Sequence, residues 1–399
     1  MPVKSERAIL IAELENLLRH MILEGDDKSV EFTEIMDIYE TVTGSRYLND
    51  RSTVPKSRAL VEILMQFGER EFKVLARCDK ASFIRLVELI KDHPIFENNS
   101  RNKQSPVWLQ LLVVLNRLGC DGNGASIQRM AMLNGTSYGS VEKFTERVFT
   151  AIRSLEAIYV YWPNPEERVR ISKRMEKNHG LPGAVGIVDG TPVNFEQRPA
   201  IDGADYFSRK SRYCINLQLV CDDKKRIRHY LTGWPGSQFD SQVFDHSILC
   251  RNPPLCFSPG EYLMADAGYC LRDYICTPYR KPAALIPENR IFNVLFSTAR
   301  VFIEHVNGIL KGRFQSLKGL RIQVKKLDDF VRVNEWIVVC IILHNILLSF
   351  KDDWDDYDLE DNGNDTAGVI IDTNRGENLR EVVQLNLLNQ AARHVALPF

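Results

Sequence analysis

Apolar positions recur at helical spacing through the first third of the chain. Between residues 82 and 90 they repeat every three to four residues, and the almost unbroken apolar run 107–118 ends at Gly119. The first pattern predicts an amphipathic helix. The second predicts a helix buried on most of its surface, because few polar side chains remain to face solvent.

Residues 126–152 predict a short helix, a glycine turn and a longer helix. Ser126 is suited to cap the short helix, Asn134-Gly135 to end it, and Ser137 to start the longer one. Such a pair is the pattern of a helix-turn-helix that reads DNA, although any small helical bundle contains similar pairs. The side chains that the longer helix would present to DNA are Ser137, Ser140, Lys143 and Arg147.

The pattern changes after Trp162-Pro163, where runs rich in valine, isoleucine, leucine and tyrosine predict strands. The expected order is strand 185–197, strand 213–223, strand 226–236, helix 240–249 and strand 261–269. This order is typical of the first half of a ribonuclease-H-like domain. We therefore expect an α/β fold, with a mixed sheet flanked by helices, preceded by an all-helical region with the helix-turn-helix.

Helices return in the last third of the chain. We expect one around Glu304 and another over 328–349, joined by a loop or strand at 315–327. Residues 351–375 are acidic and contain glycine, as flexible segments do. The stretch 377–395 has the spacing of an amphipathic helix.

Composition fits an ordinary globular protein: 399 residues, 44% hydrophobic and 26% charged, allow two or three domains. The nine cysteines form no C-x-x-C pair, so we expect neither a zinc site nor a disulfide framework. The longest apolar run, Trp336–Leu348, is interrupted by polar residues. It is expected to be a buried helix and not a membrane span.

Charge is unevenly distributed. The formal net charge is −1, but residues 352–361 hold seven acids and no base, which leaves +6 on the rest of the chain. From Arg290 to Arg332 nine lysines and arginines face three acids. Local basic stretches of this kind favour phosphate binding, although a solvated helix face is the alternative.

Three acidic residues indicate metal-dependent chemistry. Asp189 and Asp266 each end an apolar run, and Glu304 lies inside a helical stretch. A carboxylate at the tip of a buried strand is costly unless a cation compensates its charge. Neighbouring strands would bring the two aspartates to one sheet edge, and the glutamate would complete an all-oxygen cage for two Mg²⁺ or Mn²⁺ ions. The alternative is that these are turn acids and N-caps, because Asp-Gly is a common turn pair.

Arg300, Glu304 and Lys311 share one face of the predicted helix. An acid between two bases could bind a metal ion while its neighbours contact the DNA backbone. A simple surface ion pair is the alternative.

Four motifs occur in an order and spacing that resemble the nuclease domain of PIF/Harbinger transposases, in the DDE superfamily. They are VDGT (188–191), GWPGSQFDSQVF (233–244), ADAGY (265–269) and R-x3-E-x6-K (300–311), the last followed by GRF. The resemblance implies a cut-and-paste DNA transposase or a host protein derived from one. By motif, Asp189, Asp266 and Glu304 would be the catalytic acids and metal ligands, and Asp240 would support them.

The resemblance also implies partners. The family is expected to bind terminal inverted repeats and target DNA and to work with a separate Myb-like DNA-binding protein. Paired DNA ends imply a homodimer, no membrane is involved, and residence in the nucleus follows from the DNA substrate. The chain departs from the family at His305, where arginine is more usual, and at Ser297, where a related signature has tyrosine. Both departures put DNA-backbone contact beside Glu304 in question.

Two groups of basic residues are candidates for DNA contact. The group after the first strand is Arg198, Arg209, Lys210 and Arg212, for which exposed turn charges are the alternative. The basic run near the end of the domain is Lys311, Arg313, Lys318, Arg321, Lys325 and Lys326.

Two other functions stay open: a domesticated DNA-binding protein that no longer cleaves, and a general nuclease for other nucleic acids. The expected divisions are a helical extension (1–80), a helical DNA-binding region with the helix-turn-helix (81–165), the ribonuclease-H-like nuclease domain (166–350), an acidic flexible linker (351–376) and a C-terminal amphipathic helix (377–399).

Overall fold

The chain divides into two compact units, Met1–Pro55 and Lys56–Phe399. The computed structural model describes residues 6–45, 48, 63, 66–98, 101–354 and 374–395. Most of the predicted acidic linker, at 355–373, lies outside these described residues.

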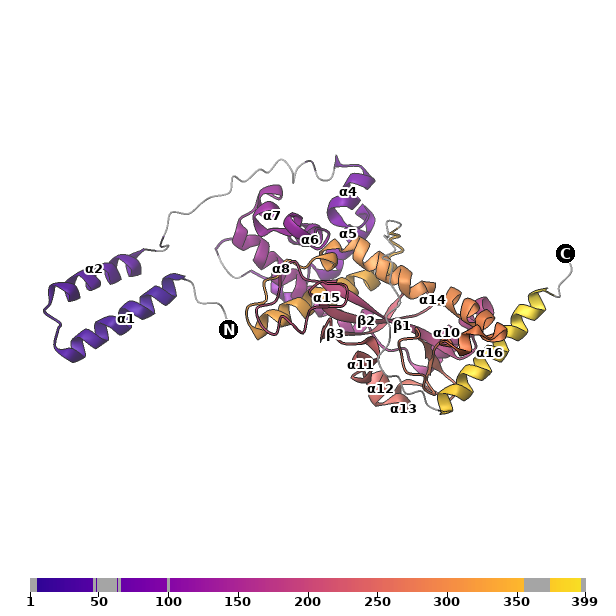
Figure 1. The fold of residues 1–399 in the computed structure, drawn as a ribbon. Coiled ribbons are helices and arrows are strands. Elements are labelled where there is room, and N and C mark those ends of the chain that lie inside the picture. The colour runs from indigo at the N-terminus through magenta and orange to yellow at the C-terminus, as the bar shows by residue number, and fades with distance from the viewer. Residues whose placement is uncertain are drawn as a thin grey trace. The chain divides into compact units, whose positions relative to one another are not determined.

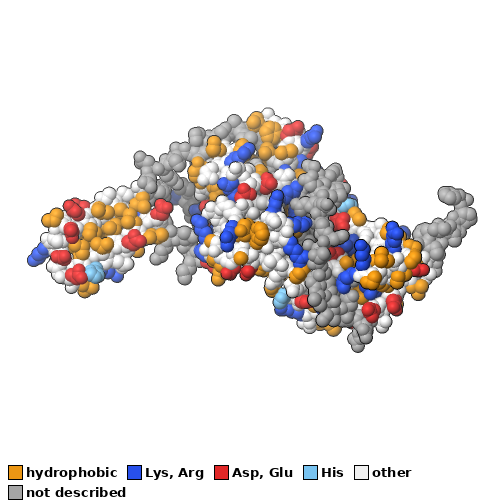
Figure 2. All heavy atoms as spheres, in the orientation of Figure 1, with side chains coloured by type: hydrophobic (Ala, Val, Ile, Leu, Met, Phe, Trp, Pro, Cys, Tyr) orange, Lys and Arg blue, Asp and Glu red, His pale blue; other side chains and the backbone are white. Residues whose placement is uncertain are grey.

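The first unit is a helical hairpin of α1 (Glu6–Glu24) and α2 (Val30–Gly44) (Figure 1). The Ser29 hydroxyl caps α2 by accepting a hydrogen bond from the Phe32 amide at 3.0 Å. Many apolar side chains of the hairpin remain on its surface (Figure 2).

Helices also form the first part of the second unit. Ser126 accepts a hydrogen bond from the Arg129 amide and Ser137 from the Ser140 amide, so both predicted N-caps are confirmed. The predicted buried helix ends at Gly119, as expected. The helices are α4 (Glu69–Ala76), α5 (Lys80–Ile90), α6 (Val107–Leu118), α7 (Ile127–Leu133), α8 (Tyr138–Arg153), α9 (Glu156–Tyr159) and α10 (Pro165–His179), with 3-10 turns η2 (Pro94–Phe96) and η3 (Gly122–Ala125).

A five-stranded mixed sheet forms the centre of the second unit (Figure 1). Its strands are β1 (Ala184–Asn194), β2 (Cys214–Cys221), β3 (Ile227–Pro235), β4 (Tyr262–Met264) and β5 (Ile275–Cys276), in the order β3-β2-β1-β4-β5. The first three are antiparallel neighbours, and β4 and β5 run parallel to β1. β1 is therefore central with β4 beside it, as expected, whereas β5 is too short to have been predicted.

Helices cover the sheet. α14 (Pro287–Arg313) packs against β1 and β2, α15 (Leu327–Ser349) against β3 and α8, and α16 (Asn374–Val395) against α14 and β5. The single helix expected at 240–249 is instead two short helices, because Ser247 caps a new one. The helices are α11 (Asp240–Asp245), α12 (Ile248–Arg251), α13 (Pro253–Cys256), α14 (Pro287–Arg313), α15 (Leu327–Ser349) and α16 (Asn374–Val395), with 3-10 turns η4 (Ala283–Leu285) and η5 (Gln315–Lys318).

α15 is long and apolar enough to cross a bilayer by length and composition, but 72% of its most apolar window is buried inside the protein. Thirteen of its residues are buried in the core, as the sequence predicted for this stretch. All nine cysteines are free.

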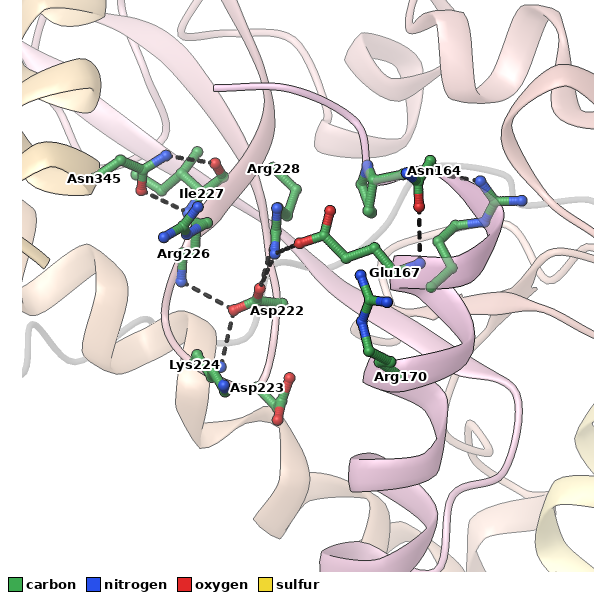
Figure 3. A network of polar contacts seen from close by, with 12 residues as sticks. Asn164, Glu167, Arg170, Asp222, Asp223, Lys224, Arg226, Ile227, Arg228 and Asn345 are labelled. Carbon is green, nitrogen blue, oxygen red and sulfur yellow. Dashed lines mark hydrogen bonds and ion pairs between the residues drawn. The ribbon is translucent and has the colours of Figure 1, made fainter. Parts of the chain in front are cut away.

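A network of polar contacts joins the β2–β3 turn to α10 and α15 (Figure 3). The Asp222 carboxylate accepts from the Arg228 Nε at 2.8 Å, and Arg228 Nη2 donates to Glu167 of α10 at 2.6 Å. The Asn345 side chain of α15 bonds both backbone groups of Ile227, at 2.9 and 2.7 Å. Each buried charge in this network therefore has a partner of opposite sign, which fixes β3 against the helices.

Candidate active site

Asp189 lies in the middle of β1, opposite Leu219 of β2, with 8% of its surface exposed. The strand predicted at 185–197 is observed as β1, which continues past Asp189 to Asn194, so this acid does not lie at the tip of a strand. The next residue is Gly190, where an added Cβ would lie 2.2 Å from the Asp240 carboxylate. Only a glycine lets this second acid approach the backbone of β1 so closely.

Asp240 is the first residue of α11. Its Oδ1 accepts a hydrogen bond from the Asn216 Nδ2 at 2.7 Å, and its backbone oxygen accepts from the Gln218 Nε2 at 2.9 Å. Both donors come from β2, so the central sheet holds this acid beside β1.

Asp266 lies two residues beyond β4, and its Oδ1 accepts from the Gly268 amide at 2.9 Å. The buried Tyr269 follows, and its hydroxyl accepts from the Gln218 Nε2 at 2.9 Å. Burial raises the pKa of Tyr269 well above its ordinary value, and the charges of Asp240, Asp189 and Asp266 raise it further. The charges of all three aspartates thus act on one buried hydroxyl, which sequence reasoning missed although Tyr269 belongs to the motif ADAGY.

Burial raises the pKa of Asp189 from 3.8 to about 8; Arg300 lowers it, and Asp266 and Asp240 raise it. Arg300 compensates the buried charge of Asp189 poorly, because the Arg300 Nη2 lies 3.8 Å from the Asp189 Oδ1. The Asn307 Nδ2 adds a hydrogen bond of 3.3 Å to Oδ2. Asp189 is therefore a buried acid that holds a proton at neutral pH until a cation comes near.

The third expected acid, Glu304, does not meet the aspartates. It is exposed on α14, whereas Arg300 is half-buried and Lys311 is only 5% exposed. The face of α14 that meets the sheet presents Arg300 and Asn307 to Asp189. The three members of the R-x3-E-x6-K motif therefore lie in different environments, and the glutamate faces solvent.

Within the described ranges, no group of three or more His, Cys, Asp and Glu side chains is close enough to hold a metal ion. The donors that are present still suit a hard cation. The side-chain oxygens of Asn216 and Asn307 are buried and without a hydrogen-bond partner in the described part of the chain. Like the carboxylates of Asp189, Asp240 and Asp266, they are oxygen donors, which is the ligand type that Mg²⁺ and Mn²⁺ prefer.

The predicted recognition helix presents some of its expected side chains to solvent. Lys143 is exposed on α8 and Arg147 is half-buried. Ser137 and Ser140 bond each other at 2.8 Å at the N-terminus of the helix, so their hydroxyls are already used in capping. DNA contact by these residues stays a prediction.

Most of the other predicted basic contacts lie at the surface. Arg198, Arg209 and Lys210 are exposed after β1, and Arg209 stacks on the Phe239 ring at 4.0 Å. From the basic run, the exposed or half-buried members are Lys318, Arg321, Lys325 and Lys326.

Arg313 is buried, with only 2% of its surface exposed. Its Nη1 bonds the Asp352 carboxylate at 2.9 Å and the Arg77 carbonyl at 3.0 Å, and the Trp354 ring lies 5.0 Å from its guanidinium. The expected DNA contact is therefore replaced by a structural ion pair. The start of the predicted flexible linker is correspondingly packed against the domain, since Asp352 is buried.

Comparisons with known proteins match the part of the chain that contains these residues. Residues 188–345 match the family model described as "DDE superfamily endonuclease". The Bos taurus protein "Putative nuclease HARBI1" is 27% identical over 236 residues, 59% of this chain and 66% of that protein, and its Homo sapiens namesake gives the same values. The Arabidopsis thaliana "Protein ALP1-like" is 25% identical over 325 residues, 77% of this chain and 74% of that protein. No solved structure matches the chain significantly.

The chain thus spans just under two thirds of the length of the mammalian relatives. The matched segment begins one residue before Asp189 and contains Asp240, Asp266 and Glu304. The resemblance carried by the four motifs is confirmed: residues 188–345 match the DDE superfamily endonuclease model, and the chain is similar to Harbinger-derived relatives.

Proposed function

We propose that this chain is a metal-dependent DNA endonuclease and strand transferase with a ribonuclease-H-like catalytic domain. The observation that carries the proposal is Asp189, a buried acid in the central strand that has two further aspartates beside it and no adequate cation among the described residues. The strand order, with β1 central and β4 parallel beside it, supports the ribonuclease-H-like assignment.

Asp189 and Asp266 would hold the divalent cation, and Asp240 would add negative charge from beside Gly190. A bound cation would supply the Lewis acid that activates the attacking oxygen and stabilises the leaving oxygen of a phosphodiester. Asp189 must first lose its proton, because only the carboxylate is a ligand. We propose two ions per site, with Glu304 as the third acid, although this acid is exposed in the present structure.

Cut-and-paste transposition, with binding of terminal inverted repeats and target DNA, is the fuller form of the proposal. α7 and α8 support DNA recognition by this chain itself. They pack together as a short helix, a turn and a long helix, and Lys143 is exposed on the long helix. A homodimer is supported by exposed Val382 and Leu385 on α16, and light scattering of DNA-bound protein tests it. A Myb-like partner and nuclear residence rest on the family alone.

A DNA-binding protein without cleavage activity is the second candidate. It is favoured by the exposure of Glu304, because the group of acids lacks its expected third carboxylate in this structure.

Nicking of supercoiled DNA in Mn²⁺ tests the proposal. Wild type should nick the DNA, while Asp189→Ala and Asp266→Ala should lose at least about a hundredfold in rate, as expected when a group that stabilises the transition state is removed. Asp273→Ala is the matched control, because this acid is exposed and lies between β4 and β5. Equal nicking by all four proteins, or none by any, would contradict the enzyme. Preferential cleavage of RNA would indicate a general nuclease.

A further inference from the structure

A polar cavity of about 320 Å³ lies between the helical region and the nuclease domain. Its walls come from α6, α7 and α8 on one side and from residues 196–197, 320–323 and α15 on the other. A volume of this size suits a small ligand or one group of a larger ligand. The cavity is separate from the three aspartates, none of which lines it.

Arg117 is the buried charge of this cavity, with 7% of its surface exposed. Its Nη1 donates to the Thr145 hydroxyl at 2.9 Å, and the guanidinium lies 5.0 Å from the Trp336 ring. Its Nε is buried and has no hydrogen-bond partner among the described residues. A buried cation with neither a carboxylate contact nor a full set of acceptors is costly to keep without an anion.

The electrostatics of Arg117 agree with this. Burial lowers its pKa to about 10, and the neighbouring Arg332 lowers it as well, whereas Glu142 raises it. An arriving anion would remove the cost that burial imposes.

The charges of the lining also limit what the ligand can be. Three arginines, Arg117, Arg321 and Arg332, stand against two glutamates, Glu142 and Glu196, which leaves one net positive charge. A phosphodiester carries a single negative charge and balances this lining, whereas a phosphate dianion would exceed it. The planar guanidinium is well matched to phosphate oxygens.

We propose that this cavity binds one phosphodiester group of DNA, with Arg117 as its buried contact and Arg321 as an exposed one. This rests on the proposed function only in taking DNA as the substrate. The cavity includes Glu142 of α8, the residue before the exposed Lys143, so a bound phosphate would fix the predicted recognition helix and the nuclease domain on one duplex.

Fluorescence anisotropy with a short duplex, in chelator and over a range of salt concentrations, tests the proposal without cleavage. Arg117→Gln and Arg321→Gln should each weaken binding about tenfold. Each should also reduce the log–log salt slope, by at most about 0.9, because both arginines contact one phosphate. Arg170→Gln is the matched control, because Arg170 is exposed on α10 and does not line the cavity. Thermal melting checks that Arg117→Gln folds. If this variant does not fold, Arg321→Gln still tests the proposal, because Arg321 is exposed.

The following results are decisive. Unchanged slopes in Arg321→Gln and in folded Arg117→Gln would overturn the inference. Calorimetry showing that inorganic phosphate binds through Arg117 while DNA slopes stay unchanged would also overturn it, in favour of a free-phosphate site. Nicking activity with unchanged slopes would overturn the cavity proposal but support the proposed endonuclease. Reduced slopes without any nicking would support the cavity proposal and contradict the endonuclease.

Discussion

The buried acid of β1 gives the sharpest prediction. Replacing Asp189 with Asn keeps the shape of the side chain but removes its ionisation. In the unfolded chain the carboxyl ionises near pH 3.8, whereas burial raises its pKa to about 8 in the folded protein. Between these values the folded state binds more protons than the unfolded state, so stability falls as pH rises.

The expected size follows from the two pKa values. Between about pH 5 and pH 8 wild type should lose about 3.5 kcal/mol of unfolding free energy relative to Asp189→Asn. His229 and His344, whose pKa values burial lowers to about 4, are present in both proteins and cancel in the comparison.

Urea unfolding in chelator, followed by tryptophan fluorescence, measures this difference. All five tryptophans lie in the second unit, so the signal reports that unit alone. A change below about 1 kcal/mol between the two pH values would refute the reasoning, because it would mean that the carboxyl ionises normally in the folded state. Adding Mg²⁺ at about pH 8 should stabilise wild type more than the variant.

Three further predictions concern neighbouring features. Gly190→Ala should destabilise the protein by about 1–3 kcal/mol in urea unfolding, because the added Cβ would lie 2.2 Å from the Asp240 carboxylate. Gly139→Ala on α8 is the control and should be neutral or stabilising, because its added Cβ would have no neighbour within 4 Å. Asp352→Ala should cost about 3–5 kcal/mol, since it leaves the Arg313 charge buried alone, and a loss below about 1 kcal/mol would contradict this. Glu304→Ala should abolish nicking while unfolding stability changes by less than about 0.5 kcal/mol, because the side chain is exposed; undiminished nicking would exclude it as the third acid.

The sequence by itself determined the local structure and the family resemblance. Apolar runs and cap residues predicted α6, α7 and α8 and the first three strands, because periodicity and capping depend on near neighbours. Four ordered motifs indicated the DDE superfamily endonuclease model that residues 188–345 match. The sequence did not show the close approach of Asp240 to Gly190, because the two residues lie far apart along the chain.

Tertiary structure alone decided burial and charge pairing. Helical spacing places Arg300 and Glu304 on one side of α14, but the rotation of the helix against the sheet sets which of them meets Asp189. Arg313 looked like a surface contact in the sequence, but Asp352, which lies 39 residues further along the chain, pairs with it in the interior. Periodicity fixes which side chains share a face, whereas the environment of that face depends on packing with segments far away in sequence.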